Sequence, residues 1–151
     1  MKDSCALEEH LAKAQLQFRL AGIAVKRARS VYAWKRECSA GDIEKMEKLT
    51  RLVECHYRSD KAVVFYSAQL GLSVKTLNRL CSFLLGQTVY QLVMDRRLRE
   101  ARKLLVRSEI GIREVAAGAG FKNVSCFSRF FKGMTGMSPR AYRYQARRNS
   151  C

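Results

Sequence analysis

The sequence is poor in the residues that build sheets and tight turns. It has one proline, Pro139, in 151 residues, no Asn-Gly or Asp-Gly pair, and few stretches that alternate strictly between apolar and polar side chains. Two-residue hairpins and half-buried strands depend on those signals. A β-sheet is therefore excluded, and an all-α fold is predicted.

Long apolar segments are also missing. The sequence has no run of about 18 apolar residues, which a membrane-spanning helix would need. The first ten residues, MKDSCALEEH, carry acidic side chains where a signal peptide has its apolar core. We expect a cytoplasmic protein with no span in a membrane.

Sites for metals and for cysteine chemistry are not recognisable. The six cysteines form no Cys-x-x-Cys pair, and the two histidines, His10 and His56, stand alone. Zinc sites and activated cysteine nucleophiles both depend on such neighbours. The chain also has no P-loop and no paired-carboxylate motif. No cofactor, no metal and no catalytic residue are predicted, and the thiols are expected to stay reduced.

Positive charge, in contrast, is abundant. The chain has 29 Lys+Arg against 13 Asp+Glu, a formal net charge of +16. Most of the surplus lies in residues 61–151, which carry 17 basic and four acidic residues. Such a surplus indicates a polyanionic partner, nucleic acid in the first place and an acidic membrane surface less readily. The alternative is a solvated basic face without a partner.

Apolar residues recur at three- and four-residue spacing along most of the chain, which is typical of amphipathic helices. This pattern predicts a helical extension over residues 1–38, and Ser39-Ala40-Gly41 is typical of a linker after it. Asp42 is expected to cap the next helix, which ends near Tyr57. Residues 42–148 are predicted to form the main domain.

Side chains that cap helices mark the remaining helix starts. Thr88 and Gln91 form a capping box, T-x-x-Q, in front of a long helix over residues 89–107. Its 19 residues would span roughly 28 Å. Pro139 suits the first position of the last helix because that position needs no N–H group. The expected caps are Ser73, Thr88, Asn123 and Ser138, and the expected stops are Gly71, Gly86 and Gly133.

Two stretches of the main domain resemble each other. FYSAQLGLSVKTLNRL (residues 65–80) aligns with EVAAGAGFKNVSCFSRF (residues 114–130). In each, a small residue is followed four positions later by a glycine, then by an apolar residue and a capped helix. This is the helix-turn-helix pattern, in which two helices cross closely at a small side chain and a glycine adopts positive φ in the turn.

The two copies match at the positions that the motif constrains. Ser67 and Gly71 in the first copy correspond to Ala116 and Gly120 in the second. A generic helical bundle is the alternative, but two copies joined by a capped helix in a basic segment favour a duplicated DNA-binding unit. The residues expected to face the core are Leu77, Leu80, Phe127 and Phe130.

This arrangement resembles the DNA-binding domain of the AraC/XylS family of bacterial transcription regulators. The resemblance covers residues 49–143 and rests on LGLSVKTLNRL, on VYQLVMDRRLREARKLL and, most specifically, on IGIREVAAGAGFKNVSCFSRFFKGMTGMSPRAYR. It implies two helix-turn-helix subdomains, at about residues 61–86 and 110–133, joined by the linker helix. The sequence departs from the family at Ser67, where alanine is usual, and at Leu84-Leu85-Gly86, where a charged helix end is more common.

The resemblance also implies the function and the partners. We expect a sequence-specific regulator of double-stranded promoter DNA, an activator that acts with RNA polymerase in the bacterial nucleoid. Many relatives carry a larger N-terminal effector domain, for which this chain has no room. Residues 1–38 are similar to the helices that end such a domain and pair subunits, and a homodimer through residues 5–37 is expected. The chain is either a short regulator or a fragment.

Each duplicated unit is expected to place its second helix in a major groove, which is wide enough to admit it. Arginine suits the two acceptors of guanine, asparagine suits adenine, and cysteine suits apolar contact with a thymine methyl group. The side chains opposite the apolar face, which we expect to contact bases, are Lys75, Asn78, Arg79, Ser125, Cys126 and Arg129. For Arg129 the alternative is a surface ion pair with Glu114.

Phosphate contacts are expected at the capped helix starts, Ser73 and Asn123, where backbone amides point outward. The resemblance adds Ser128, Arg140 and Arg143. The two reading helices would meet successive major grooves, about 34 Å apart. The basic residues of the linker helix stay ambiguous because their spacing places them on more than one side: Arg96, Arg97, Arg99, Arg102, Lys103 and Arg107.

Two other functions stay open. A DNA-repair or modifying enzyme could use the same DNA-binding module with a cysteine nucleophile, but neither histidine lies in a recognisable motif near a cysteine. A helical module that pairs subunits through residues 5–37 is the third possibility.

Overall fold

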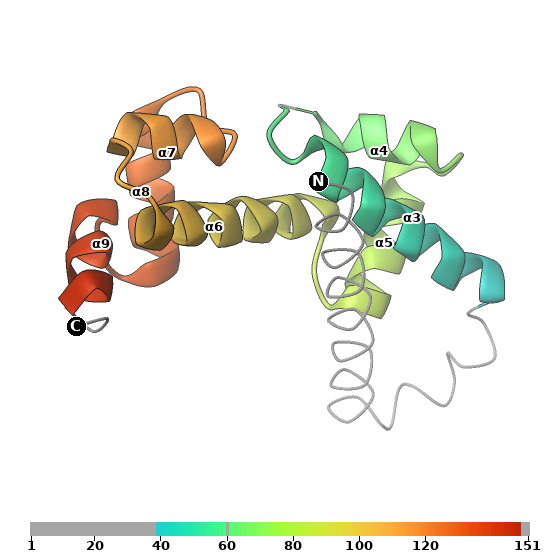
Figure 1. The fold of residues 1–151 in the computed structure, drawn as a ribbon. Coiled ribbons are helices and arrows are strands. Elements are labelled where there is room, and N and C mark those ends of the chain that lie inside the picture. Colours follow the sequence, from blue (N-terminus) through green and yellow to red (C-terminus); the bar gives the residue numbers. More distant parts are fainter. Residues whose placement is uncertain (1–38, 60, 149–151) are drawn as a thin grey trace, which may run out of the picture. The chain divides into compact units, whose positions relative to one another are not determined.

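The structure is a computed structural model that describes residues 39–59 and 61–148. In this part of the chain all regular structure is helical, with seven helices and no strand (Figure 1). The predicted all-α fold is therefore confirmed. Among these helices, none is both long and apolar enough to cross a membrane. The expected extension, with its pairing segment at residues 5–37, lies outside the described residues.

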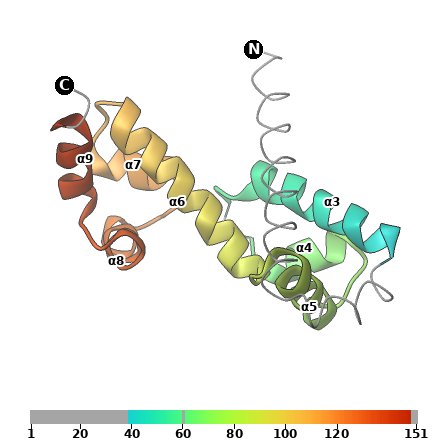
Figure 2. The same ribbon diagram turned by 90° about the horizontal axis from the view of Figure 1, so that it is seen from below.

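The described chain falls into two compact units. Unit 1 contains α3 (Ala40–His56), α4 (Val63–Gln69), α5 (Val74–Leu85) and the first turn of α6 (Val89–Arg107). Unit 2 contains the rest of α6, α7 (Ile112–Gly118), α8 (Val124–Thr135) and α9 (Pro139–Arg148), together with the turn that follows α3. In both views α7, α8 and α9 gather around the C-terminal half of α6 (Figure 1 and Figure 2).

The start of α3 corrects the expected linker. Ala40 and Gly41 form the first turn of this helix instead of a flexible connection. Asp42 Oδ2 accepts hydrogen bonds from the Ser39 backbone N–H at 3.1 Å and from the Ser39 hydroxyl at 3.2 Å. Asp42 therefore closes the helix start from the third helical position, as the acidic member of a capping box, and not as the first cap.

The capping box predicted for α6 is present. The Thr88 backbone N–H donates to Gln91 Oε1 at 2.8 Å, and the Gln91 backbone N–H donates to Thr88 Oγ1 at 3.3 Å. Each side chain satisfies a backbone group that the helix start would otherwise leave unpaired. The helix then continues without interruption to Arg107, as expected.

The predicted end of α8 at Gly133 is wrong. The helix passes through Gly133 and ends at Thr135, with Gly136 as its left-handed cap at φ 79°. A glycine inside a helix costs only about 1 kcal/mol relative to alanine. The residue that follows a helix often needs a positive φ angle, which glycine adopts without strain, and Gly136 occupies that position.

Each unit has its own apolar core. The core of unit 2 includes three aromatic rings in series: Phe127 lies 5.7 Å from Phe131, which lies 5.3 Å from Tyr142, centroid to centroid. Phe130 is only half-buried, 5.2 Å from Phe121, so Phe131 and not Phe130 joins Phe127 in the core. Buried residues in unit 1 include Met46, Leu49, Val53, Tyr66, Leu77, Leu80 and Cys81. Those in unit 2 include Leu98, Ala101, Leu105, Val115, Ala116, Ala119, Phe127 and Phe131.

Candidate nucleic-acid interface

The two units contain the same turn. The Leu72 backbone N–H donates to the Ser67 carbonyl at 3.0 Å, and the Phe121 backbone N–H donates to the Ala116 carbonyl at 2.8 Å. Ser67 and Ala116 are both buried, as the close crossing of two helices requires. The Ser67 hydroxyl is satisfied by the Val64 carbonyl at 2.9 Å, so serine replaces alanine here without an unpaired buried group.

The turn glycines have the predicted backbone conformation, with φ 63° at Gly71 and φ 87° at Gly120. Their surroundings differ. A Cβ atom at Gly120 would lie 2.7 Å from Arg58 Cα and 2.9 Å from the Tyr57 carbonyl oxygen, whereas one at Gly71 would meet nothing within 4 Å. Both glycines are needed for their φ angle, and Gly120 is needed also for the close approach of the turn after α3.

Helix α8 separates an anchoring side from an exposed polar side. The Asn123 side chain caps it by accepting from the backbone N–H groups of Ser125 at 2.8 Å and Cys126 at 3.1 Å. Phe127 and Phe131 are fully buried on one side. Ser125, Cys126 and Arg129 are exposed on the other side, as expected for residues that meet a DNA groove. Arg129 Nη2 lies 3.8 Å from Cys126 Sγ.

Helix α5 has the same organisation. Ser73 caps it by accepting from the Thr76 backbone N–H at 3.1 Å. Leu77, Leu80 and Cys81 are buried, while Lys75 and Arg79 are exposed on the opposite side.

Asn78 differs from its neighbours. It is half-buried, and its Oδ1 accepts a hydrogen bond from the backbone N–H of Val89 at 3.1 Å. Val89 is the first residue of α6, so Asn78 caps that helix from a neighbouring one. Adenine recognition by asparagine uses the amide oxygen and nitrogen together. Here the oxygen already has a partner inside unit 1.

Two more residues lie on the helix sides that we expect to meet bases, and the sequence analysis missed both. Ser82 and Lys132 lie seven positions after Lys75 and Ser125, which is two helical turns and therefore the same side. Lys132 is exposed and Ser82 is half-buried. The helical period alone could have identified both.

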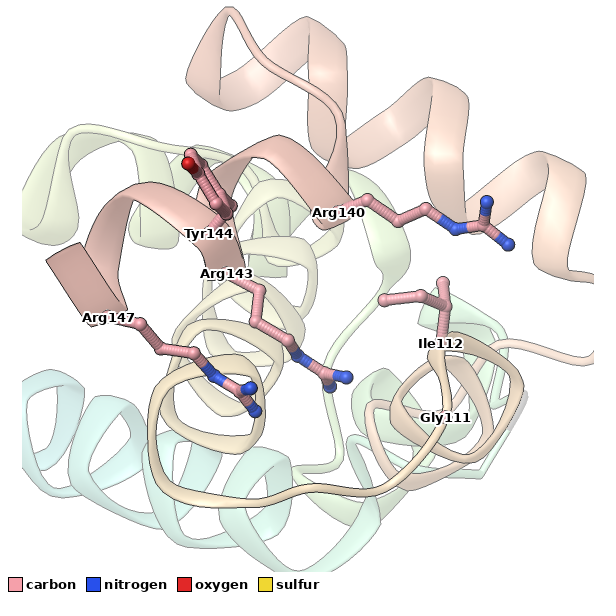
Figure 3. A pocket seen from close by; sticks show the side chains of 6 residues that line it. All are labelled: Gly111, Ile112, Arg140, Arg143, Tyr144 and Arg147. Atoms are coloured by element: carbon pink, nitrogen blue, oxygen red, sulfur yellow. The ribbon is translucent and has the colours of Figure 1, made fainter.

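The expected phosphate contacts fall into three groups. At Ser73 and Asn123 the caps already occupy the amides of Thr76, Ser125 and Cys126. Ser128 is half-buried in α8, and Arg140 is exposed on α9. Arg143 lines a pocket beside the start of α7 (Figure 3), and its Nε and Nη2 are withdrawn from solvent without a hydrogen-bond partner among the described residues.

The ambiguous basic residues of α6 divide by burial. Arg97 is buried and donates from Nε to the Tyr57 carbonyl at 2.7 Å and from Nη2 to the Ser59 carbonyl at 3.1 Å. Arg96 is half-buried, with its guanidinium 4.1 Å from the centre of the Tyr57 ring. These two hold the turn after α3 within unit 2. The remaining members of the set are exposed: Arg99, Arg102, Lys103 and Arg107.

Residues 39–59 and 61–148 contain three cysteines and the histidine His56. No three His, Cys, Asp or Glu side chains there are placed to hold a metal ion. Cys55, Cys81 and Cys126 are free thiols. Burial raises the pKa of the Cys81 thiol from 9.0 to about 12, which keeps it protonated at neutral pH.

Comparisons with known proteins agree with this geometry. A family model described as a helix-turn-helix domain matches residues 66–145. The transcriptional activator NphR of Rhodococcus sp is 33% identical over 109 residues, which cover 70% of this chain and 32% of NphR. The HTH-type transcriptional regulator ExsA of Pseudomonas aeruginosa is 27% identical over 94 residues, which cover 62% of this chain and 34% of ExsA. The chain therefore spans about a third of the length of these relatives.

Solved structures of similar fold include DNA-binding domains of transcription regulators. The DNA-binding domain of AdpA, in complex with a target DNA, has a TM-score of 0.62 at 28% identity and covers 75% of this chain and 100% of that domain. The C-terminal domain of AraT, a response regulator from Geobacillus stearothermophilus, has a TM-score of 0.64 at 26% identity and covers 72% of this chain and 88% of that domain.

Two helix-turn-helix units that share one long helix define a class of DNA-binding proteins in which each unit presents one helix to the duplex. Both the fold and the matched sequence place this chain in that class. The chain belongs to the AraC family of DNA-binding transcription regulators, as its sequence indicated.

Proposed function

We propose that this chain binds promoter DNA by inserting α5 and α8 into successive major grooves and that it activates transcription. The observation that supports this most directly is α8. Phe127 and Phe131 are fully buried, and the opposite side presents Ser125, Cys126 and Arg129 to solvent. A helix fixed on one side and polar on the other is what a major groove can accept.

Base contacts are assigned to the exposed side of each reading helix. In α8, Arg129 would donate to guanine O6 and N7, Ser125 would adapt to several bases, and Cys126 would meet a thymine methyl group. In α5, Lys75 and Arg79 would contact guanine. Asn78 would contribute only its Nδ2 group, since its oxygen caps α6, and so gives one hydrogen bond instead of the pair that reads adenine.

Phosphate contacts would fix the position of each unit on the duplex without reading its sequence. We assign them to the helix starts at Ser73 and Asn123, to Ser128 and to Arg140 of α9. Arg143 was expected here too, but its Nε and Nη2 are withdrawn from solvent. In unit 2, Asn123 and Arg140 are exposed, whereas Ser128 is half-buried.

The proposal extends to the whole regulator. NphR is a transcriptional activator by name, which supports activation and therefore contact with RNA polymerase. Pairing of two chains would involve residues 5–37. The protein would act in the bacterial cytoplasm, at the nucleoid, because that is where promoters lie. No enzymatic activity is proposed.

The test is sequence discrimination by Arg129→Ala. DNA selected from a random pool by the wild-type chain is compared with DNA changed at single positions, in gel shifts at fixed salt. Loss of one bidentate contact should reduce discrimination at one position by about 1–3 kcal/mol, with a smaller loss on unrelated sequences. Arg51→Ala, an exposed arginine of α3, is the matched control. An equal loss on all sequences would reassign Arg129 to a phosphate.

A further inference from the structure

Unit 2 has a pocket away from the exposed side of α8. It lies between α9 and the start of α7, and its volume is about 370 Å³. Figure 3 shows the side chains of Arg140, Arg143 and Arg147 extending from α9 toward the segment at Gly111 and Ile112. The pocket is therefore strongly positive and has a backbone segment as its opposite wall.

The arginines form a continuous stripe with Tyr144. Positions 140, 143, 144 and 147 follow the spacing that places residues on one side of a helix. Tyr142 lies on a different side of α9, where its ring packs edge-on against Phe131 of α8. The stripe therefore faces away from α8 and toward the segment at Gly111 and Ile112.

Of the three arginines in the stripe, Arg147 has a carboxylate partner and Arg143 has two nitrogen atoms without one among the described residues. Arg147 forms an ion pair with Glu109 at 2.6 Å, at the rim, where the Glu109 side chain is 86% exposed. Arg143 Nε and Nη2 have no hydrogen-bond partner among the described residues, although both atoms are withdrawn from solvent. Because these two Arg143 atoms are buried, an incoming anion would meet the exposed guanidinium groups of Arg140 and Arg147. A carboxylate is the acceptor that matches the parallel N–H groups of an arginine.

Apolar surface lies next to this charge. Tyr144 is 66% exposed and Ile110, beside Gly111, is 38% exposed. Exposed tyrosine and arginine around a recess are the composition of protein-binding hot spots. We infer that this pocket receives a carboxylate side chain from an acidic segment of a partner protein, with an apolar neighbour of that carboxylate packed on Tyr144.

A protein carboxylate fits the pocket better than a DNA phosphate does. A backbone phosphate carries two sugars and meets donors at the outer surface, whereas this pocket has α9 on one side and the segment at Gly111 and Ile112 on the other. DNA backbone contacts also gain little from an exposed tyrosine and isoleucine. Glu109 shows that a carboxylate already binds at the rim. The inference does not depend on the proposed reading of bases, since α8 takes part in neither the stripe nor the recess.

The test uses the full chain and a short fluorescein-labelled peptide of glutamates interspersed with leucines, measured by fluorescence anisotropy at physiological salt. Arg147→Gln and Tyr144→Ala should each weaken binding about fivefold, the loss of about 1 kcal/mol. Glu109→Gln should strengthen it about threefold, because it frees Arg147 for the peptide.

Two controls separate specific docking from attraction to a basic protein. Arg102→Gln removes the same charge from an exposed site on α6, and a peptide with glutamine in place of glutamate removes the anion. Equal weakening by Arg102→Gln, or equal binding of the glutamine peptide, would overturn the inference.

A parallel gel shift with selected DNA distinguishes the two proposals. Arg147→Gln should leave DNA affinity within about twofold of Arg102→Gln. If it lowers DNA affinity as strongly as peptide affinity, the pocket belongs to the DNA interface and the inference is wrong, while the proposed function stands. If the wild-type chain binds the peptide but does not discriminate between DNA sequences, the proposed function fails and the inference stands.

Discussion

At the scale of single residues, burial separates cysteines that look alike in the sequence. Cys81 and Cys126 both lie in the second helix of a helix-turn-helix unit, but Cys81 is fully buried and Cys126 is exposed. The thiolate is the reactive form, and burial disfavours it. The pKa of Cys81 is raised to about 12 because its thiol lies on the buried side of α5, away from water.

This difference predicts selective alkylation. With iodoacetamide under native conditions at mildly alkaline pH, Cys55 and Cys126 should be modified while Cys81 stays unmodified, because its thiol is both inaccessible and protonated. Mass spectrometry of proteolytic peptides measures each site. In urea all three should react, which controls for peptide recovery. Modification of native Cys81 at the rate of Cys126 would contradict the structure of unit 1.

Side-chain roles were only partly predictable at this scale. The helical period correctly placed Lys75, Arg79 and Arg129 at the surface, because exposure follows from the apolar residues opposite them. It could not show that Asn78 caps α6, since that hydrogen bond joins residues on two helices. The roles of the arginines in α6 were equally out of reach, because the acceptors of Arg97 lie about forty positions earlier in the chain.

At the scale of helices, starts were more predictable than ends. A helix start is fixed by side chains within three or four residues, as at Thr88 and Asn123, and these signals are visible in the sequence. Gly133 and Gly136 are equally plausible stops for α8 by composition. Only the structure shows that Gly136 has the positive φ angle.

The turn glycines allow a matched prediction of stability. Gly71→Ala should cost roughly 1–2 kcal/mol, the cost of positive φ for a residue with a Cβ atom. Gly120→Ala should cost more than Gly71→Ala, because its Cβ would also meet the backbone of Arg58 and Tyr57. Urea unfolding followed by circular dichroism measures both. Equal losses of stability in the two variants would mean that the turn after α3 moves away and leaves room for a Cβ atom at Gly120.

At the scale of the whole molecule, the proposed function requires two half-sites on one side of the duplex. Their expected separation is about one helical turn of DNA. Inserting about five base pairs rotates one half-site to the opposite side, which a continuous helix such as α6 cannot follow. We expect the affinity to fall at least on the order of tenfold, to that of a single half-site.

Scrambling one half-site is the control for this experiment, and it should lower the affinity to the same level. An unchanged affinity after the insertion would show that the two units bind independently. Gel-shift titrations of the three DNA duplexes at one salt concentration measure these affinities, and fixed salt matters for a chain of net charge +16.

The pocket on α9 shows why part of the molecule could not be predicted. The sequence shows the arginines and gives their helical spacing, and the family resemblance named Arg140 and Arg143. It does not show that Gly111, about thirty residues earlier, forms the opposite wall. That neighbourhood arises from the packing of three helices around Phe127 and Phe131, which no local pattern encodes.

The hydrogen bond between Asn78 and Val89 has a consequence for how the DNA preference of such a regulator can change over evolution. Lys75 and Arg79 are exposed and can be exchanged with little effect on folding. A substitution at position 78 would alter both the proposed groove contact and the hydrogen bond to the first turn of α6. New operator preferences should therefore arise first at positions 75 and 79. Position 78 should change more slowly, because its side chain also caps α6.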